Sequence, residues 1–202
     1  MQRIRCNKSV IAIRPSHASY GILGCELYDK DDENHTEQGR VKNPLDGKKY
    51  VENKIDWLIH TGQKITEGKP TARTYSRIVS PGDLNKGWRF GVVTSTLAKD
   101  KLPQFLSGNG DVEITYHTVS DIGLDVDKVG FTSKRRHRVI GSKICRVDYE
   151  FLAFVERDGP KFELRVKGDS HPLKLERQHS QPGGISEGNK DGFIINDDCQ
   201  FN

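Results

Sequence analysis

The stretch that decides the fold is KICRVDYEFLAFV, which spans residues 143–155. Apolar or aromatic side chains occupy every second position, and they are Cys145, Val147, Tyr149, Phe151, Ala153 and Val155. The charged residues Arg146, Asp148 and Glu150 fall between them. Successive side chains of a strand point to opposite faces of a sheet, so this alternation predicts a half-buried β-strand.

A second alternating run follows directly at residues 161–167. Phe162, Leu164 and Val166 alternate there with charged side chains. The sequence RDGP at residues 157–160 separates the two runs and is typical of a tight turn. The two runs together predict a β-hairpin.

Shorter runs of the same kind predict further strands at residues 19–28, 69–80, 88–93 and 111–117. Residues 53–60 fit a strand and a short amphipathic helix equally well. Gly21 and Gly24 lie inside the first run, where glycine indicates a bulge or a close approach of two backbones. About eight short strands without a long helical pattern predict a mainly β chain, folded as an antiparallel β-sandwich with few or no helices.

The organisation expected along the chain has three parts. A lead of residues 1–18 precedes the β-sandwich domain, which we place at residues 19–178. A tail of residues 179–202 is rich in Gly and polar residues, and we expect it to be largely disordered. Within the domain, residues 29–49 are polar and contain turn signals, so they predict a long surface loop.

Composition limits the class of protein. The chain has 202 residues, of which 34% are hydrophobic and 30% charged, with a formal net charge of +4. This length suits one domain, and so mild a positive charge does not by itself indicate nucleic acid. No apolar run reaches the length of a membrane span, and the four cysteines show no CxxC spacing. We therefore expect a cytoplasmic protein with reduced thiols.

Motifs for nucleotide or cofactor binding are missing from the sequence. There is no phosphate-binding glycine loop. The seven histidines form no HxH or HxxxH pair, which argues against a metal site. Asp121, Asp125 and Asp127 lack the glycine and glutamate of a calcium loop and fit a polar edge strand better. We expect no enzymatic activity and no cofactor.

The strongest charge cluster consists of Lys134, Arg135, Arg136 and Arg138. Such a cluster can act as an interaction loop for an acidic partner or for nucleic acid. It also fits a solvated loop that joins the two strands of a hairpin. The second interpretation is favoured because no aromatic residues are interleaved with the charges.

Three sequence blocks carry a resemblance to a known family. They are Arg14-x-x-x-x-Ser19-Tyr20-Gly21, the segment WLIHTGQKI at residues 57–65, and the paired finish DYEF and FELRV at residues 148–151 and 162–166. In this order they resemble the C-terminal half of divergent seventy-kilodalton heat-shock-like proteins, which are actin-like ATPase relatives. The resemblance covers residues 14–168.

The resemblance implies a non-catalytic β-domain like the substrate-binding part of these chaperones. Its partners would be extended or unfolded polypeptide segments, held along a sheet edge by main-chain hydrogen bonds. Residues 1–18 would be the remnant of the exit from an ATPase domain. The ATPase domain itself and the helical lid have no counterpart in this chain, so a truncated gene product is an alternative.

Overall fold

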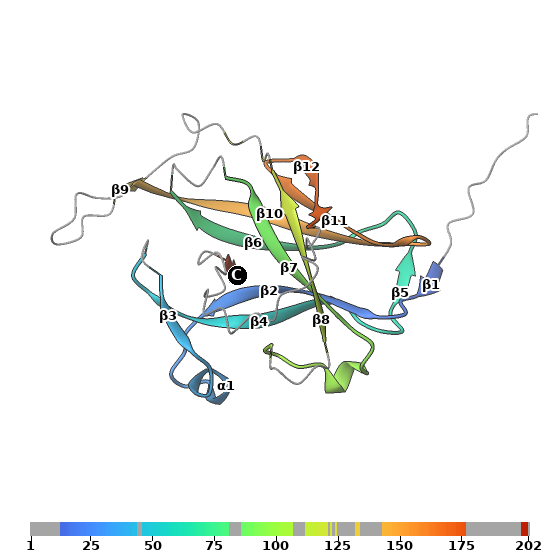
Figure 1. Ribbon diagram of the computed structural model, residues 1–202, viewed down its shortest axis with the longest axis horizontal. Coiled ribbons are helices and arrows are strands. Elements are labelled where there is room, and N and C mark those ends of the chain that lie inside the picture. Colours follow the sequence, from blue (N-terminus) through green and yellow to red (C-terminus); the bar gives the residue numbers. More distant parts are fainter. Residues whose placement is uncertain are drawn as a thin grey trace, which may run out of the picture.

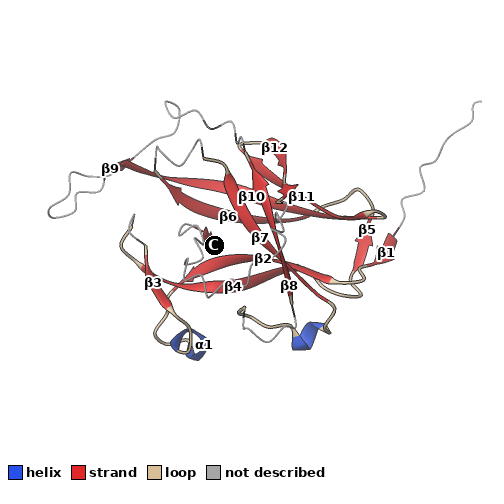
Figure 2. Ribbon diagram, viewed as in Figure 1, coloured by secondary structure: helices blue, strands red, loops and turns tan. Residues whose placement is uncertain are grey.

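The computed structural model describes residues 13–43, 46–80, 86–106, 112–120, 122, 124, 132–133, 143–176 and 199–201. These residues are mostly β-strand, with two short helical turns (Figure 2). All strand pairings among them are antiparallel except one parallel contact, between β14 and β2. The prediction of a mainly β chain with antiparallel sheets and few helices is confirmed.

Seven strands are long and form the body of the fold: β2 (Ser19–Leu27), β4 (Lys49–Ile59), β6 (Thr71–Val79), β7 (Trp88–Ser95), β8 (Glu113–Val119), β10 (Lys143–Glu156) and β11 (Gly159–Val166). The other strands have four residues or fewer: β1 (Ile13–Pro15), β3 (Arg40–Lys42), β5 (Lys64–Thr66), β9 (Thr132–Ser133), β12 (Asp169–Pro172), β13 (Lys174–Leu175) and β14 (Cys199–Phe201). The helical turns are α1 (Glu33–Thr36) and a 3-10 turn at Lys99–Lys101. The described strands exceed the eight expected because several short pieces pair with the long strands or with one another.

Two groups of strands face one another across a shared core (Figure 1). One group has the order β12-β11-β10-β6, and the other has β4-β2-β7-β8, with β3 and β13 at its edges. Trp88 and Phe90 of β7 pack against Tyr149 and Phe151 of β10, with ring centroids 5.5 and 5.7 Å apart for Trp88–Tyr149 and Phe90–Phe151. These aromatic contacts join the two layers and bury the largest side chains of the core.

The predicted hairpin is formed by β10 and β11. Val155 pairs with Pro160 and Glu156 with Gly159, so only two residues remain in the turn. The inward face of β10 carries Val147, Tyr149, Phe151 and Ala153, all of which are buried. From Arg146 to Phe151 the alternation read from the sequence is the alternation of buried and more exposed positions, whereas Leu152, on the other face, is also fully buried.

The ambiguous segment at residues 53–60 belongs to β4 except for its last residue, since β4 ends at Ile59. It pairs with β2, where the register shifts on both sides of the two glycines. Gly21 also lies close to β4, because a Cβ atom there would come within 2.8 Å of Ile55 Cγ2. Both meanings proposed for glycine in this strand, a bulge and a close approach, are present.

The segment predicted as a surface loop, residues 29–49, carries more structure than expected. It contains α1 and β3, and β3 pairs with β4. It also contributes a buried histidine, His35, which is only 3% exposed. A polar sequence conceals this because the burial depends on side chains from other strands.

The described parts of the lead and the tail are both paired to the domain. In the lead, β1 pairs with β5, and the Arg14 guanidinium donates a hydrogen bond of 3.0 Å to the carbonyl of Val155. In the tail, β14 pairs with β6 and β2; residues 177–198 and 202 lie outside the described residues. Neither helical turn that the structure describes has the length or apolar character needed to cross a bilayer.

Candidate functional site

The site singled out by the topology is the space between β6 and β2 that β14 fills, which we call the strand slot. Cys199, Gln200 and Phe201 run antiparallel to β6, opposite Arg77, Ser76 and Tyr75. On the other side, Gln200 lies opposite Cys25 of β2 in a parallel contact. Figure 1 shows the C-terminal end of the chain between these two strands.

The slot exists because β2 has two different neighbours along its length. Its first part, Ser19 to Ile22, pairs with β7, and that register ends where Ile22 meets Val92. Farther along, the register with β4 passes from Gly24 to Glu26 and skips Cys25. A bulge of this kind redirects a strand and changes which neighbour it can pair with. Cys25, at the bulge, lies opposite β14.

The β6 wall of the slot is tied to the core. Tyr75, Ser76 and Arg77 are all at least 96% buried. The Tyr75 hydroxyl donates a 2.8 Å hydrogen bond to the Asp56 carboxylate of β4, and the Arg77 guanidinium lies 5.0 Å from the ring centroid of Trp88. These contacts hold the β6 backbone in place, so the strand offers a rigid edge for pairing.

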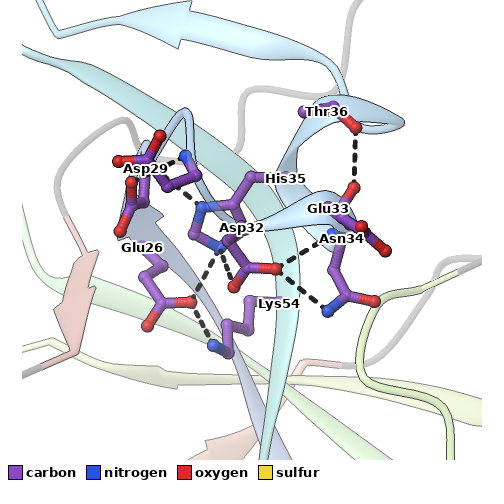
Figure 3. Close-up of polar contacts among 9 residues, drawn as sticks. Glu26, Asp29, Asp32, Glu33, Asn34, His35, Thr36 and Lys54 are labelled. Carbon is purple, nitrogen blue, oxygen red and sulfur yellow. Dashed lines mark hydrogen bonds and ion pairs between the residues drawn. The ribbon is translucent and has the colours of Figure 1, made fainter.

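The β2 wall is fixed by a polar cluster around His35 (Figure 3). The His35 Nε2 atom lies 3.2 Å from Glu26 Oε2 and 3.7 Å from Asp32 Oδ2. Lys54 of β4 forms an ion pair with the same Glu26 carboxylate. The cluster therefore links α1 to the end of β2 and to β4, directly beside Cys25.

The hydrogen bonds indicate the tautomer of His35. Its Nδ1 atom accepts a 3.0 Å hydrogen bond from the backbone N–H of Asp29, so the ring proton resides on Nε2 and points to Glu26. Asp32 caps α1 by accepting a 2.9 Å hydrogen bond from the N–H of Asn34. The backbone and side-chain hydrogen bonds from Asn34 lower the pKa of Asp32, so the cap is ionised at neutral pH.

The chemistry of the slot is that of main-chain pairing. Its walls offer the backbone groups of β6 and β2, and the residues around them are small, buried or engaged with the core. Among the described residues, no group of three His, Cys, Asp or Glu side chains could hold a metal ion.

The residues predicted for a basic interaction loop, Lys134, Arg135, Arg136 and Arg138, lie outside the described residues. Their flanks are described: β9 pairs with the start of β10, where Ser133 lies opposite Lys143. The cluster thus belongs to the connection between two antiparallel strands. Asp121, Asp125 and Asp127 also lie outside the described part of the chain.

Sequence reasoning missed the strand slot and the His35 cluster. β14 has three residues, which is too short for a periodic signal, and its partners are more than 120 residues away in the chain. The weak signal was the order Cys-Gln-Phe, an apolar–polar–apolar triplet in a polar tail. His35 is a lone histidine in a charged segment and gave no signal at all.

A family model matches residues 14–174 of this chain, and its description reads Domain of unknown function (DUF8568). The match spans the described body of the fold from β1 to the start of β13. No curated protein and no solved structure matches the chain.

Proposed function

Since the chain belongs to this family of unknown function, we propose a function from the geometry of the strand slot: the protein binds an extended polypeptide segment as an added strand. The ligand would pair with β6 in antiparallel and with β2 in parallel direction. Main-chain hydrogen bonds would supply the affinity, as in other cases of strand addition.

The observation that carries this proposal is β14 itself. A segment remote in sequence from both walls lies between them in extended conformation and pairs on both sides. A backbone of another chain can make the same pairings, because they do not depend on a particular side chain. The resemblance to the substrate-binding part of heat-shock-like proteins predicts the same class of ligand.

The energetics set the length of the ligand. A net hydrogen bond contributes about 0.5–1.5 kcal/mol, so three residues alone give weak binding after the cost of association. β6 spans nine residues, of which three lie opposite β14. We therefore expect a ligand that extends beyond the length of β14 along β6.

The natural test uses the full chain and a labelled peptide of residues 193–202, FIINDDCQFN. Because β14 belongs to the same chain, its effective concentration at the slot is high, and it competes there with any added ligand. Gln200→Pro weakens this competitor, because proline is excluded from a strand paired on both sides. The variant should bind the peptide at least about tenfold more tightly than the unmodified chain, which corresponds to roughly 1.4 kcal/mol. Fluorescence anisotropy measures both affinities.

The control is the same peptide with proline at the position of Gln200, which should not bind. Added salt separates this proposal from the basic-loop hypothesis, since electrostatic docking weakens steeply with salt and main-chain pairing does not. If neither the chain nor the Gln200→Pro variant binds the peptide at about 1 mM, where even a ligand with a free energy of about −4 kcal/mol is half bound, strand addition at the slot is wrong.

A further inference from the structure

A cavity of about 470 Å³ is lined by residues of β7, β8 and β11 and of the segment from β12 to β13, none of which line the strand slot. One wall comes from β7 and β8 and carries Thr94, Thr115 and His117. The opposite wall carries Phe162 of β11, Leu173 between β12 and β13, and Leu175 of β13. The cavity therefore has one wall with hydrogen-bonding groups and one apolar wall.

The polar wall is preorganised. Thr115 and His117 are two residues apart on β8 and point to the same face, and Thr115 Oγ1 lies 3.1 Å from His117 Nε2. The His117 ring also packs edge-on against Phe162, with centroids 5.2 Å apart. Burial lowers the pKa of His117, so this imidazole is neutral at physiological pH. A neutral imidazole and two hydroxyls can each donate or accept hydrogen bonds.

The charges at the mouth disfavour an anionic ligand. Glu113 and Glu163 both line the cavity, and the lining cation, Lys161, already forms ion pairs with Glu156 and Asp158. On the apolar side, Leu175 is 59% exposed at the rim, although large apolar side chains are usually covered. The mouth thus combines apolar surface with carboxylates.

The volume of the cavity and the strand pairing beside it favour a small molecule over a peptide as the ligand. Cavities of roughly 300–1,000 Å³ hold ligands of this kind. Strand addition is blocked over part of the neighbouring edge, because β13 pairs with His117 and Thr118 of β8 and the N–H of Glu176 donates to the carbonyl of Tyr116.

We propose that this cavity binds a small, uncharged, largely apolar molecule that carries a hydroxyl, carbonyl or amide group. The apolar body would lie against Phe162 and Leu173, and the polar group would face Thr115 and His117. This site is separate from the strand slot, so either proposal can fail without the other.

Nile red, an uncharged apolar dye with a carbonyl group, is a suitable probe because its fluorescence rises in an apolar site. Thr115→Trp fills the cavity, and we expect it to weaken dye binding at least about tenfold. Thr118→Trp makes the same exchange on the opposite face of β8 and should leave the affinity within about twofold. Thermal melts of both variants establish that they are folded.

Leu175→Ser supplies a second variant, since an exposed side chain can be replaced without loss of the fold. It should weaken dye binding about threefold by removing apolar contact area. The proposal is overturned if all three variants, Thr115→Trp, Leu175→Ser and Thr118→Trp, bind the dye equally well. It is also overturned if the unmodified chain does not bind at about 100 μM dye. Displacement of the dye by an equal concentration of anionic anilinonaphthalene sulfonate would overturn it as well.

Discussion

Gly21 shows how one residue limits which side chains this fold accepts. The two strands approach so closely there that an added Cβ would meet Ile55 Cγ2 at 2.8 Å and the carbonyl oxygen of Asp56 at 3.0 Å. The carbonyl is part of the β2–β4 pairing and cannot move without disturbing it. Packing rather than backbone conformation is thus the reason for glycine at this position.

The exchange Gly21→Ala tests this reasoning. We expect it to lower the free energy of unfolding by about 1–3 kcal/mol, as overpacking typically does. Gly39→Ala is the matched control, because nothing lies within 4 Å of a Cβ placed there. The control should be neutral or slightly stabilising. Urea denaturation curves measure the stability of both variants. Equal midpoints for Gly21→Ala and Gly39→Ala would show that β4 can shift to accommodate the added methyl group.

Prediction from sequence succeeded at the residue scale where the reason was local. The glycines in β2 and the inward residues of β10 follow from strand geometry alone. His35 could not be predicted, because its burial requires Glu26 from β2 and Lys54 from β4. Nothing in a single segment of sequence reports which distant side chains will surround it.

Among the elements, α1 and β3 depend most on contacts with the rest of the fold. A helix of four residues has little stability of its own, since helix formation requires a costly first turn. α1 is held by the cap at Asp32 and by the His35 ring, which packs 6.1 Å from Phe105. The segment from α1 to β3 is thus expected to loosen as one unit when His35 is removed.

His35→Ala tests whether the segment from α1 to β3 depends on the contacts of this histidine. It leaves Glu26 and the N–H of Asp29 without their histidine partner, which costs about 1–3 kcal/mol for each buried group that stays unsatisfied. Hydrogen exchange should accelerate in α1 and β3 while β10 and β11 keep their protection. His17→Ala, at an exposed histidine, is the control and should change stability by less than about 0.5 kcal/mol. Unchanged exchange in α1 would contradict the role given to His35.

Element prediction succeeded for long periodic strands and failed for short ones. β10 and β11 were visible because apolar and charged side chains alternate within residues 143–155 and 161–167. β3 and β14 have three residues each and are strands only because a partner strand lies alongside. The ambiguity at residues 53–60 ended in favour of a strand because β4 pairs with β2, a tertiary effect.

At the scale of the whole molecule, we expect two histidines to make the stability acid-sensitive. Burial lowers the pKa of His117, and burial together with the charges of Lys99 and Arg73 lowers that of His60. The unfolded chain therefore binds more protons than the folded chain below the ordinary histidine pKa of about 6.5. The free energy of unfolding must fall as pH drops from there through the lower folded pKa values.

We expect the melting temperature to decrease between pH 7 and pH 5, and to decrease less in the double variant His60→Gln, His117→Gln. The control His17→Gln should keep the full pH dependence, because His17 is exposed. Calorimetry across this pH range measures the three slopes. If the double variant and the unmodified chain lose stability in parallel, other groups carry the acid sensitivity.

At the scale of the molecule, the sequence indicated the class of fold, a mainly β chain with antiparallel pairing. The sequence predicted two facing antiparallel layers, and it did not predict that the described strands also form one hydrogen-bonded path from β12 to β13 that runs through β14. That closure depends on three residues of the tail, and a composition rich in Gly and polar residues gave the expectation of disorder there. Long-range pairing of so short a segment cannot be read from a local pattern.

The position of β14 has a consequence for biosynthesis. Both strands that it joins are complete by Val79, and Cys199 emerges from the ribosome much later. At about 5–20 residues per second, translation of the intervening chain takes roughly 6–24 s. After β10 has been made and has paired with β6, and before β14 is made, an extended segment of another polypeptide would meet no competitor between β2 and β6.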